Sequence, residues 1–193
     1  MKPFCSGSRA DVQLLQSIQP GELKDDAVNP FFFREPVAPL VAAQRAGRRV
    51  TRGQVATHIR RLTSGIELLL VEGAGGLLSP LGHHFTAREL IRDLDASACI
   101  VAADRLGTIN HTLLTVEALR SRKLTPAAIL LTRVSRNADV SIRSNGEILA
   151  KLLHPIPVLH LPYLGPGAST LKSVREHAKR TGAVWEKLWQ TIQ

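Results

Sequence analysis

Four short apolar runs, separated by longer amphipathic stretches, constrain the fold of this chain more than any other feature. The runs are IELLLVE (66–72), ACIVAA (98–103), AAILLT (127–132) and IPVLHL (156–161). Each has the length of a β-strand and most are apolar throughout, which is typical of strands buried on both faces of a parallel sheet. Helical spacing marks the other stretches, at about 51–64, 86–94, 110–122, 141–153 and 170–190. This alternation predicts an α/β fold, an open and mainly parallel sheet flanked by helices.

The size and composition of the chain favour one domain over residues 1–193. The chain is 44% hydrophobic, which is enough to bury a core, and no repeat or linker divides it. It has no apolar run of the roughly 18 residues that a transmembrane helix needs. Its two cysteines lack metal-ligand spacing and fit a reducing cytosol, so we expect a cytoplasmic protein with no membrane association. Cys99, inside an apolar run, is predicted to be core.

The formal net charge of +9 favours anionic partners such as nucleotides or phosphate. The arginines are dispersed along the chain, however, and aromatic residues make up only 4% of it. Base-stacking platforms are therefore scarce, and most of the charge is expected to lie on solvated surface. We expect no nucleic-acid partner.

The sequence VEGAGG places one acid and a glycine-rich turn at the carboxyl end of the first apolar run. Ligands of open α/β sheets bind at this end of the strands. Glycines let a backbone approach phosphate closely, and a carboxylate there can hold a hydrated Mg²⁺. The pattern alone is also compatible with a tight turn after a buried strand, and both interpretations stay open at this point.

Six segments in a fixed order make the pattern specific. They are KPFCSGSRAD (2–11), NPFFFREPVAPLVAA (29–43), VEGAGGLLSPL (71–81), LGTINHTLLT (106–115), AAILLT (127–132) and IPVLHLPYLG (156–165). In order and spacing the chain closely resembles the dethiobiotin synthetases over at least residues 2–165. The resemblance implies a P-loop-type α/β fold, usually a homodimer, that joins 7,8-diaminononanoate and CO₂ at the expense of ATP with Mg²⁺. An amine captures CO₂ as a carbamate, ATP phosphorylates it, and the second amine closes the ring.

The resemblance implies a role for each matching residue of the first half. Lys2 corresponds to the family's catalytic lysine, which stabilises the carbamate and the transferring phosphoryl group, and Ser6 to a substrate-binding hydroxyl. Asp11 and Glu72 correspond to the acids that hold Mg²⁺, and the backbone of Gly73, Ala74 and Gly75 is expected near the phosphates. Two alternatives stay open: Lys2 as a frayed terminal charge and Asp11 as a helix N-cap.

The second half carries the remaining expected contacts. The backbone of Thr108, Ile109 and Asn110 is expected to bind the substrate carboxylate at a helix N-terminus, in a site completed across the dimer. The alternative is that Thr108 and Asn110 only cap that helix. Thr132 and Arg133 stand where the family reads the adenine base, and Pro162, Tyr163 and Leu164 match the loop that closes over it. The family usually has asparagine in place of Thr132, so the selectivity for the base is predicted to be relaxed, since threonine lacks the paired donor and acceptor of an amide.

The first part of the family's fold is missing from these 193 residues. The family begins with a strand, a P-loop and a helix. The chain has no G-x-x-x-x-G-K-[ST] and starts inside the family's second strand, so the first strand, the P-loop and the first helix are absent. We therefore expect little or no turnover by this chain alone. A start codon placed too far downstream is the simplest explanation, and a fragment, a pseudogene product or a split protein are the others. A non-catalytic binding protein and a relative of the cobyrinate amidases are the alternative functions.

Overall fold

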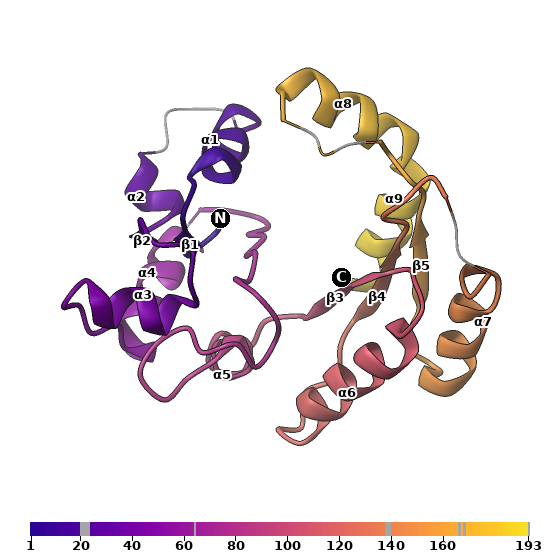
Figure 1. The fold of residues 1–193 in the computed structure, drawn as a ribbon, viewed down its shortest axis with the longest axis horizontal. Coiled ribbons are helices and arrows are strands. Elements are labelled where there is room, and N and C mark those ends of the chain that lie inside the picture. The colour runs from indigo at the N-terminus through magenta and orange to yellow at the C-terminus, as the bar shows by residue number, and fades with distance from the viewer. Residues whose placement is uncertain (20–23, 64, 138–139, 166, 168, 193) are drawn as a thin grey trace. The chain divides into compact units, whose positions relative to one another are not determined.

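The computed structural model describes residues 1–19, 24–63, 65–137, 140–165, 167 and 169–192. The chain forms two compact units, Met1–Ala96 and Ser97–Gln193, and each is described by itself (Figure 1). Parallel strands flanked by helices confirm the α/β fold. Ser64, the last residue of the helix expected over 51–64, lies outside the described residues. In the described part of the chain, no helix has both the length and the apolar content of a membrane span.

The first unit is built around two short parallel strands, β1 (Phe4–Ser6) and β2 (Phe31–Phe33), with Phe4 opposite Phe31. The rings of this pair stack with centroids 5.1 Å apart, which favours close packing of the two strands. Five helices accompany them: α1 (Ala10–Ser17), α2 (Asp25–Val28), α3 (Pro39–Arg45), α4 (Arg52–Thr63) and α5 (Ala87–Leu94). Their apolar faces, with Val12 of α1 and Val55 of α4 fully buried, close one core with the strands.

The strand predicted over 66–72 is not formed, so this prediction is wrong. The segment makes two backbone hydrogen bonds to Met1: the Met1 amino group donates to the Leu70 carbonyl (2.5 Å), and the Glu72 N–H donates to the Met1 carbonyl (2.9 Å). No described strand pairs with it on its other side. Leu69 packs against the core, but the other apolar side chains of the segment are exposed, with Leu70 69% exposed.

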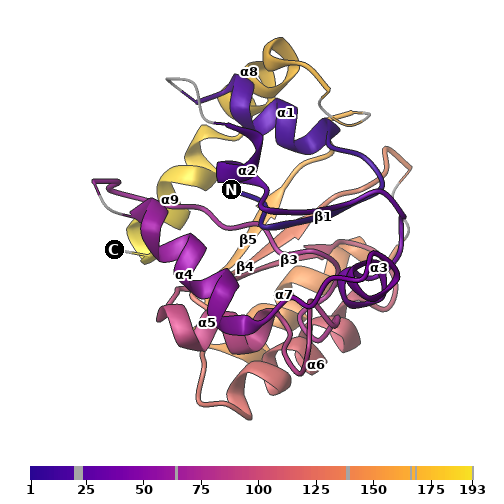
Figure 2. The same cartoon turned by 90° about the vertical axis from the view of Figure 1, so that its left-hand side faces the viewer.

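The second unit holds the three other predicted strands, in the order β3 (Cys99–Ala103), β4 (Ala128–Thr132), β5 (Val158–Leu161), all parallel. Two helices, α6 (Thr108–Arg120) and α7 (Ile142–Leu153), cover one face of this sheet, and α9 (Gly182–Ile192) lies on the other, next to β5 (Figure 1). Ile129 and Leu131 of β4 point into the core under α6 and α7. Figure 2 shows the same elements turned by 90°.

Two predictions for this unit are wrong. Cys99 is exposed rather than core. It lies on β3, an edge strand of the described sheet, on the face that α6 and α7 do not cover. Val101, two residues further along on the same face, is 68% exposed. The single helix expected over 170–190 is two helices, α8 (Leu171–Arg180) and α9, which meet at the buried Thr181. Thr181 Oγ1 accepts a 2.7 Å hydrogen bond from Trp185 Nε1. Trp185 itself is 40% exposed.

Candidate functional site

Three residues that are far apart in the sequence meet at the start of β1. Lys2 Nζ donates to Asp11 Oδ2 at 2.6 Å and to Glu72 Oε1 at 2.7 Å. The Lys2 side chain is 13% exposed, whereas those of Asp11 and Glu72 are 65% and 54% exposed. The lysine is therefore held in place and is not a frayed terminal charge. Asp11 lies in the first turn of α1, whose N-cap is Arg9, so it is not the helix cap either.

The electrostatics of this cluster keep the lysine charged. Burial alone would lower the pKa of Lys2, but its hydrogen bonds to Asp11 and Glu72 outweigh that effect and raise the pKa above its ordinary value. Hydrogen bonds between charged partners are stronger than neutral ones, so the two acids also fix the position of the ammonium.

The same cluster fits a Mg²⁺ site. Both carboxylates already converge on one cation, the Lys2 ammonium, so their oxygens are arranged around a common point. Within the described residues, no group of three or more His, Cys, Asp or Glu side chains could hold a metal by itself. Mg²⁺ is usually bound by one or two carboxylates together with waters and substrate phosphates, and two acids meet that requirement.

The turn after β1 fixes the other residues of the KP-x-x-SG sequence. Ser6 Oγ donates to the Val37 carbonyl at 2.9 Å, so its hydroxyl hydrogen is used within the chain and only acceptor capacity remains for a ligand. Gly7 has a φ of +88°, and a Cβ at this position would lie 3.1 Å from Pro36 Cβ. A glycine is therefore required where the chain turns away from Ser6.

The glycine-rich segment after Glu72 forms an exposed turn. Gly75 has a φ of +72°, and a side chain there would lie 2.7 Å from Ser79 Oγ. Ser79 Oγ accepts from the Gly76 N–H at 2.9 Å, which closes the turn. Over the described residues, the N–H groups of Gly73, Ala74 and Gly75 have no such partner. Their donors are available to an anion.

In the second unit, the predicted carboxylate site lies at the start of α6. This helix begins at Thr108 with Gly107 as its N-cap, so the alternative in which Thr108 and Asn110 only cap the helix is wrong. The Thr108 N–H donates to the Arg105 carbonyl at 3.1 Å, and Thr108 is buried. Of the three predicted backbone donors, only those of Ile109 and Asn110 are without a partner in the described structure.

The loop that leads into α6 is held by a buried polar contact. Asp104, directly after β3, is 4% exposed and accepts a 2.8 Å hydrogen bond from Asn145 Nδ2 of α7. Its N–H donates to the Thr132 carbonyl at 2.7 Å. Asp104 thus ties the ends of two strands to α7, a contact that the sequence did not suggest.

Four of the predicted nucleotide residues line one pocket of about 330 Å³ in the second unit. The predicted members are Arg133, Pro162, Tyr163 and Leu164, and the additional members are Arg136, Gly165 and Arg180. Arg136 lies in the same loop as Arg133, and Gly165 directly follows Leu164, so proximity in sequence was a usable signal for both. Arg180, on α8, gave no such signal. Thr132 does not line the pocket; its hydroxyl is buried and makes no hydrogen bond in the described part of the chain.

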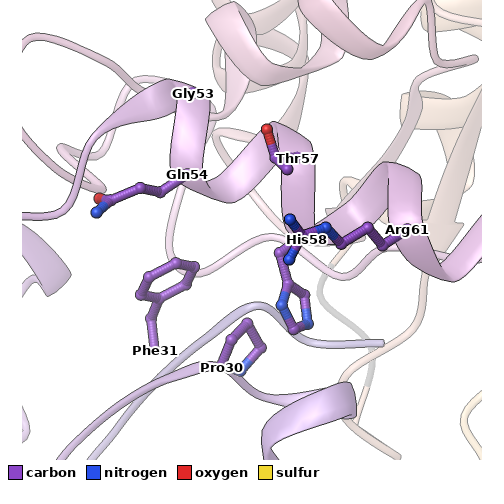
Figure 3. Close-up of a pocket in the computed structure, with 7 residues that line it drawn as sticks. All are labelled: Pro30, Phe31, Gly53, Gln54, Thr57, His58 and Arg61. Atoms are coloured by element: carbon purple, nitrogen blue, oxygen red, sulfur yellow. The ribbon is translucent and has the colours of Figure 1, made fainter.

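A further hollow of about 490 Å³ lies in the first unit, between α4 and the residues that lead into β2. Pro30 and Phe31 face the α4 side chains Gln54 and His58 across it (Figure 3). His58 Nε2 lies 3.1 Å from the Ala27 carbonyl oxygen, which fixes the ring. None of the predicted site residues lines this hollow.

Comparison with known proteins gives a consistent result. The AAA_26 family, described as an AAA domain, matches residues 1–166. A protein of Bacillus subtilis (strain 168) named ATP-dependent dethiobiotin synthetase BioD is 38% identical over 163 residues, which cover 82% of this chain and 70% of the relative. A protein of the same name from Anaeromyxobacter dehalogenans (strain 2CP-C) is 39% identical over 167 residues, or 84% of this chain and 75% of the relative.

Proposed function

The chain belongs to the family of ATP-dependent dethiobiotin synthetases, and we propose that it serves biotin biosynthesis by using ATP to form dethiobiotin from 7,8-diaminononanoate and CO₂. The observation that carries this proposal is the cluster of Lys2, Asp11 and Glu72. A cation and two acids that lie up to 70 positions apart meet within 2.6–2.7 Å, next to an exposed glycine-rich turn. This combination can bind and stabilise a substrate whose negative charge grows and moves during the reaction.

In the proposed reaction, one amine of the substrate attacks CO₂ and loses a proton to give a carbamate. The carbamate oxygen takes the terminal phosphoryl group of ATP and releases ADP, and the second amine then attacks the carbonyl carbon, expels phosphate and loses a proton. The Lys2 ammonium would stabilise the carbamate and the transferring phosphoryl group. Asp11 and Glu72 would hold Mg²⁺, which when bound neutralises phosphate charge.

The second unit would supply the other substrate contacts. We propose that the free N–H groups of Ile109 and Asn110 bind the substrate carboxylate, because a helix N-terminus favours negative charge. The pocket beside Arg133 and Tyr163 would take the nucleotide base. A homodimer in the cytoplasm, with Mg²⁺ as the metal and no nucleic-acid partner, completes the proposal.

Turnover should also need a phosphate-binding loop to hold the phosphates of ATP. These 193 residues contain no G-x-x-x-x-G-K-[ST] sequence, so they do not supply that loop. The test compares the 193-residue chain with a fusion that places the first strand, P-loop and first helix expected for the family before Met1. Both are given 7,8-diaminononanoate, bicarbonate, Mg²⁺ and ATP, and dethiobiotin is measured by mass spectrometry. We expect product from the fusion, little from the chain alone, and a loss of at least a hundredfold (about 10²–10³) in the fusion carrying Lys2→Ala, as for removal of one charge-stabilising group.

Two controls make the outcome decisive. Lys151→Ala, which removes an exposed lysine of α7, should leave the fusion's rate unchanged. Robust product from the chain alone would refute the need for the loop. A fusion that folds and binds the diamine but forms no product would favour the alternative, a binding protein without turnover.

A further inference from the structure

The pocket of the second unit is unusually rich in cations. Arg133, Arg136 and Arg180 all line it, and none of the other described residues that line it is acidic. None of the ion pairs between described residues involves any of the three. A guanidinium group offers only hydrogen-bond donors, so the pocket presents donors and positive charge to whatever enters it.

Two of the three arginines build the walls of the pocket. Arg133 donates from Nε to the Ser135 carbonyl at 3.3 Å and from Nη2 to the Arg136 carbonyl at 3.2 Å. Arg180 reaches from α8 to the opposite wall and donates to the carbonyls of Tyr163 and Leu164 at 3.4 and 3.5 Å. Their donors are largely used to hold the two loops, which fixes the shape of the pocket between them.

The third arginine is left to contact a ligand. Arg136 is exposed, and its guanidinium makes no hydrogen bond or ion pair to any described residue. Thr132, which stands where an amide would read the base, keeps its hydroxyl buried. Among the described lining residues, the Tyr163 hydroxyl is the one side-chain acceptor, and no side-chain amide is present to accept a hydrogen bond from an amino group.

We infer that this pocket reads acceptor atoms of the base and takes 6-oxopurine nucleotides, those of guanine and hypoxanthine, at least as well as adenine nucleotides. An arginine fork matches the adjacent O6 and N7 acceptors of a 6-oxopurine. Adenine puts an amino donor in place of O6, so it faces the Arg136 guanidinium with a donor against a donor. The inference rests on the proposed function, which places the nucleotide base here.

The test is a titration of the ¹⁵N-labelled chain with IMP and with AMP, followed by backbone NMR signals. The two ligands share ribose and phosphate, so their general attraction to a basic protein cancels and only the purine edge differs. We expect the amides of Arg133, Leu164 and Gly165 to shift, and IMP to bind at least as tightly as AMP and up to roughly fivefold tighter, the low end of a bidentate arginine contact. Arg136→Ala should remove that advantage and leave AMP binding within twofold. Arg122→Ala, an exposed arginine outside the pocket, is the matched control and should change neither.

Each other outcome overturns the inference in a recognisable way. If AMP shifts the pocket signals and binds tenfold or more tightly than IMP, the base reading is wrong while the proposed nucleotide site stands. If neither nucleotide shifts these signals, the nucleotide site of the proposed function fails with it. If inorganic phosphate alone produces the same shifts at the same concentration, the pocket holds an adventitious ion only.

Discussion

Two segments rich in isoleucine and leucine end up in opposite environments. AAILLT (127–132) supplies β4, which has a strand on each side and α6 and α7 on one face, and its Leu131 is 1% exposed. The backbone of IELLLVE (66–72) makes two hydrogen bonds to Met1 and pairs with no described strand, and its Leu70 is 69% exposed. An apolar run therefore supplies only the capacity to be buried. Neighbouring strands and covering helices decide whether that capacity is used.

The largest predicted effect tests this comparison by shortening one side chain in each segment. Ile129→Ala should cost about 2–5 kcal/mol of unfolding free energy, because the side chain is fully buried and its removal leaves a cavity. Leu70→Ala should change stability by no more than about 0.5 kcal/mol. Urea denaturation of both variants, read by the signals of each unit separately, makes the measurement.

These two variants control for each other, because both shorten an aliphatic side chain to alanine. A loss at Leu70 as large as that at Ile129 would contradict the comparison. It would mean that the 66–72 segment is covered in solution.

The acids at the ends of two of the apolar runs give the next largest predicted effect. Asp104 is buried behind β3 and depends on Asn145, whereas Glu72 is half exposed and shares Lys2 with Asp11. Asn145→Ala should cost about 1–3 kcal/mol, since it leaves a buried carboxylate without its donor. Glu72→Gln should cost less than about 1 kcal/mol, the usual value of an exposed ion pair. Thermal unfolding of the two variants tests this, and Asn145→Ser, which keeps a hydroxyl donor, should recover part of the loss.

The sequence anticipated those parts of the fold that depend on local periodicity. The strands of the second unit and helices α4 to α7 lie within a few residues of their predicted positions, because each carries its own apolar pattern. The exposure of Cys99 and Leu70 could not be predicted in this way, since it depends on which element covers an edge. The break at Thr181 was missed because the apolar spacing continues across it.

The candidate site was predictable for a different reason. Lys2, Asp11 and Glu72 were singled out by the order of family motifs, and no spacing rule would have joined residues 70 positions apart. The contacts that the motifs do not contain were missed, among them Arg180, which reaches its loop from α8, and Asn145, which reaches Asp104 from α7. Such residues act through tertiary neighbours and leave no local pattern.

Two helix caps, one in each unit, give a smaller and pH-dependent contrast. Thr86 and Glu89 form a capping box on α5, and Thr170 and Ser173 form one on α8. Burial alone would raise the pKa of Glu89, but hydrogen bonds from Thr86 and Arg88 lower it to about 2. A lowered folded pKa adds stability that is complete above the unfolded value of 4.5 and is lost as pH falls toward about 2. Each Thr→Ala variant should cost about 1 kcal/mol at pH 7.

The contrast lies in how these costs respond to acid. The cost of Thr86→Ala should shrink between about pH 4.5 and pH 2, whereas that of Thr170→Ala should stay constant, since neither partner of its box titrates there. Denaturant titrations at pH 7 and pH 3 make the measurement. If the stability costs of the two substitutions respond equally to acid, the Glu89 carboxylate does not contribute to the capping of α5.

The smallest predicted change concerns the reactivity of Lys2 rather than stability. Its pKa is raised because hydrogen bonds to Asp11 and Glu72 outweigh the effect of burial, so the amine is protonated and a poor nucleophile at neutral pH. Glu72→Gln removes one of these charges and should lower the pKa of Lys2, which increases the unprotonated fraction. Brief acetylation followed by mass spectrometry should then show faster modification of Lys2 relative to the exposed Lys151 of the second unit. Asp11→Asn should act in the same direction, because both acids bond the same ammonium. If neither variant changes the ratio, the two acids do not hold Lys2 in solution, and the first unit would lack the preformed cation site on which the proposed chemistry depends.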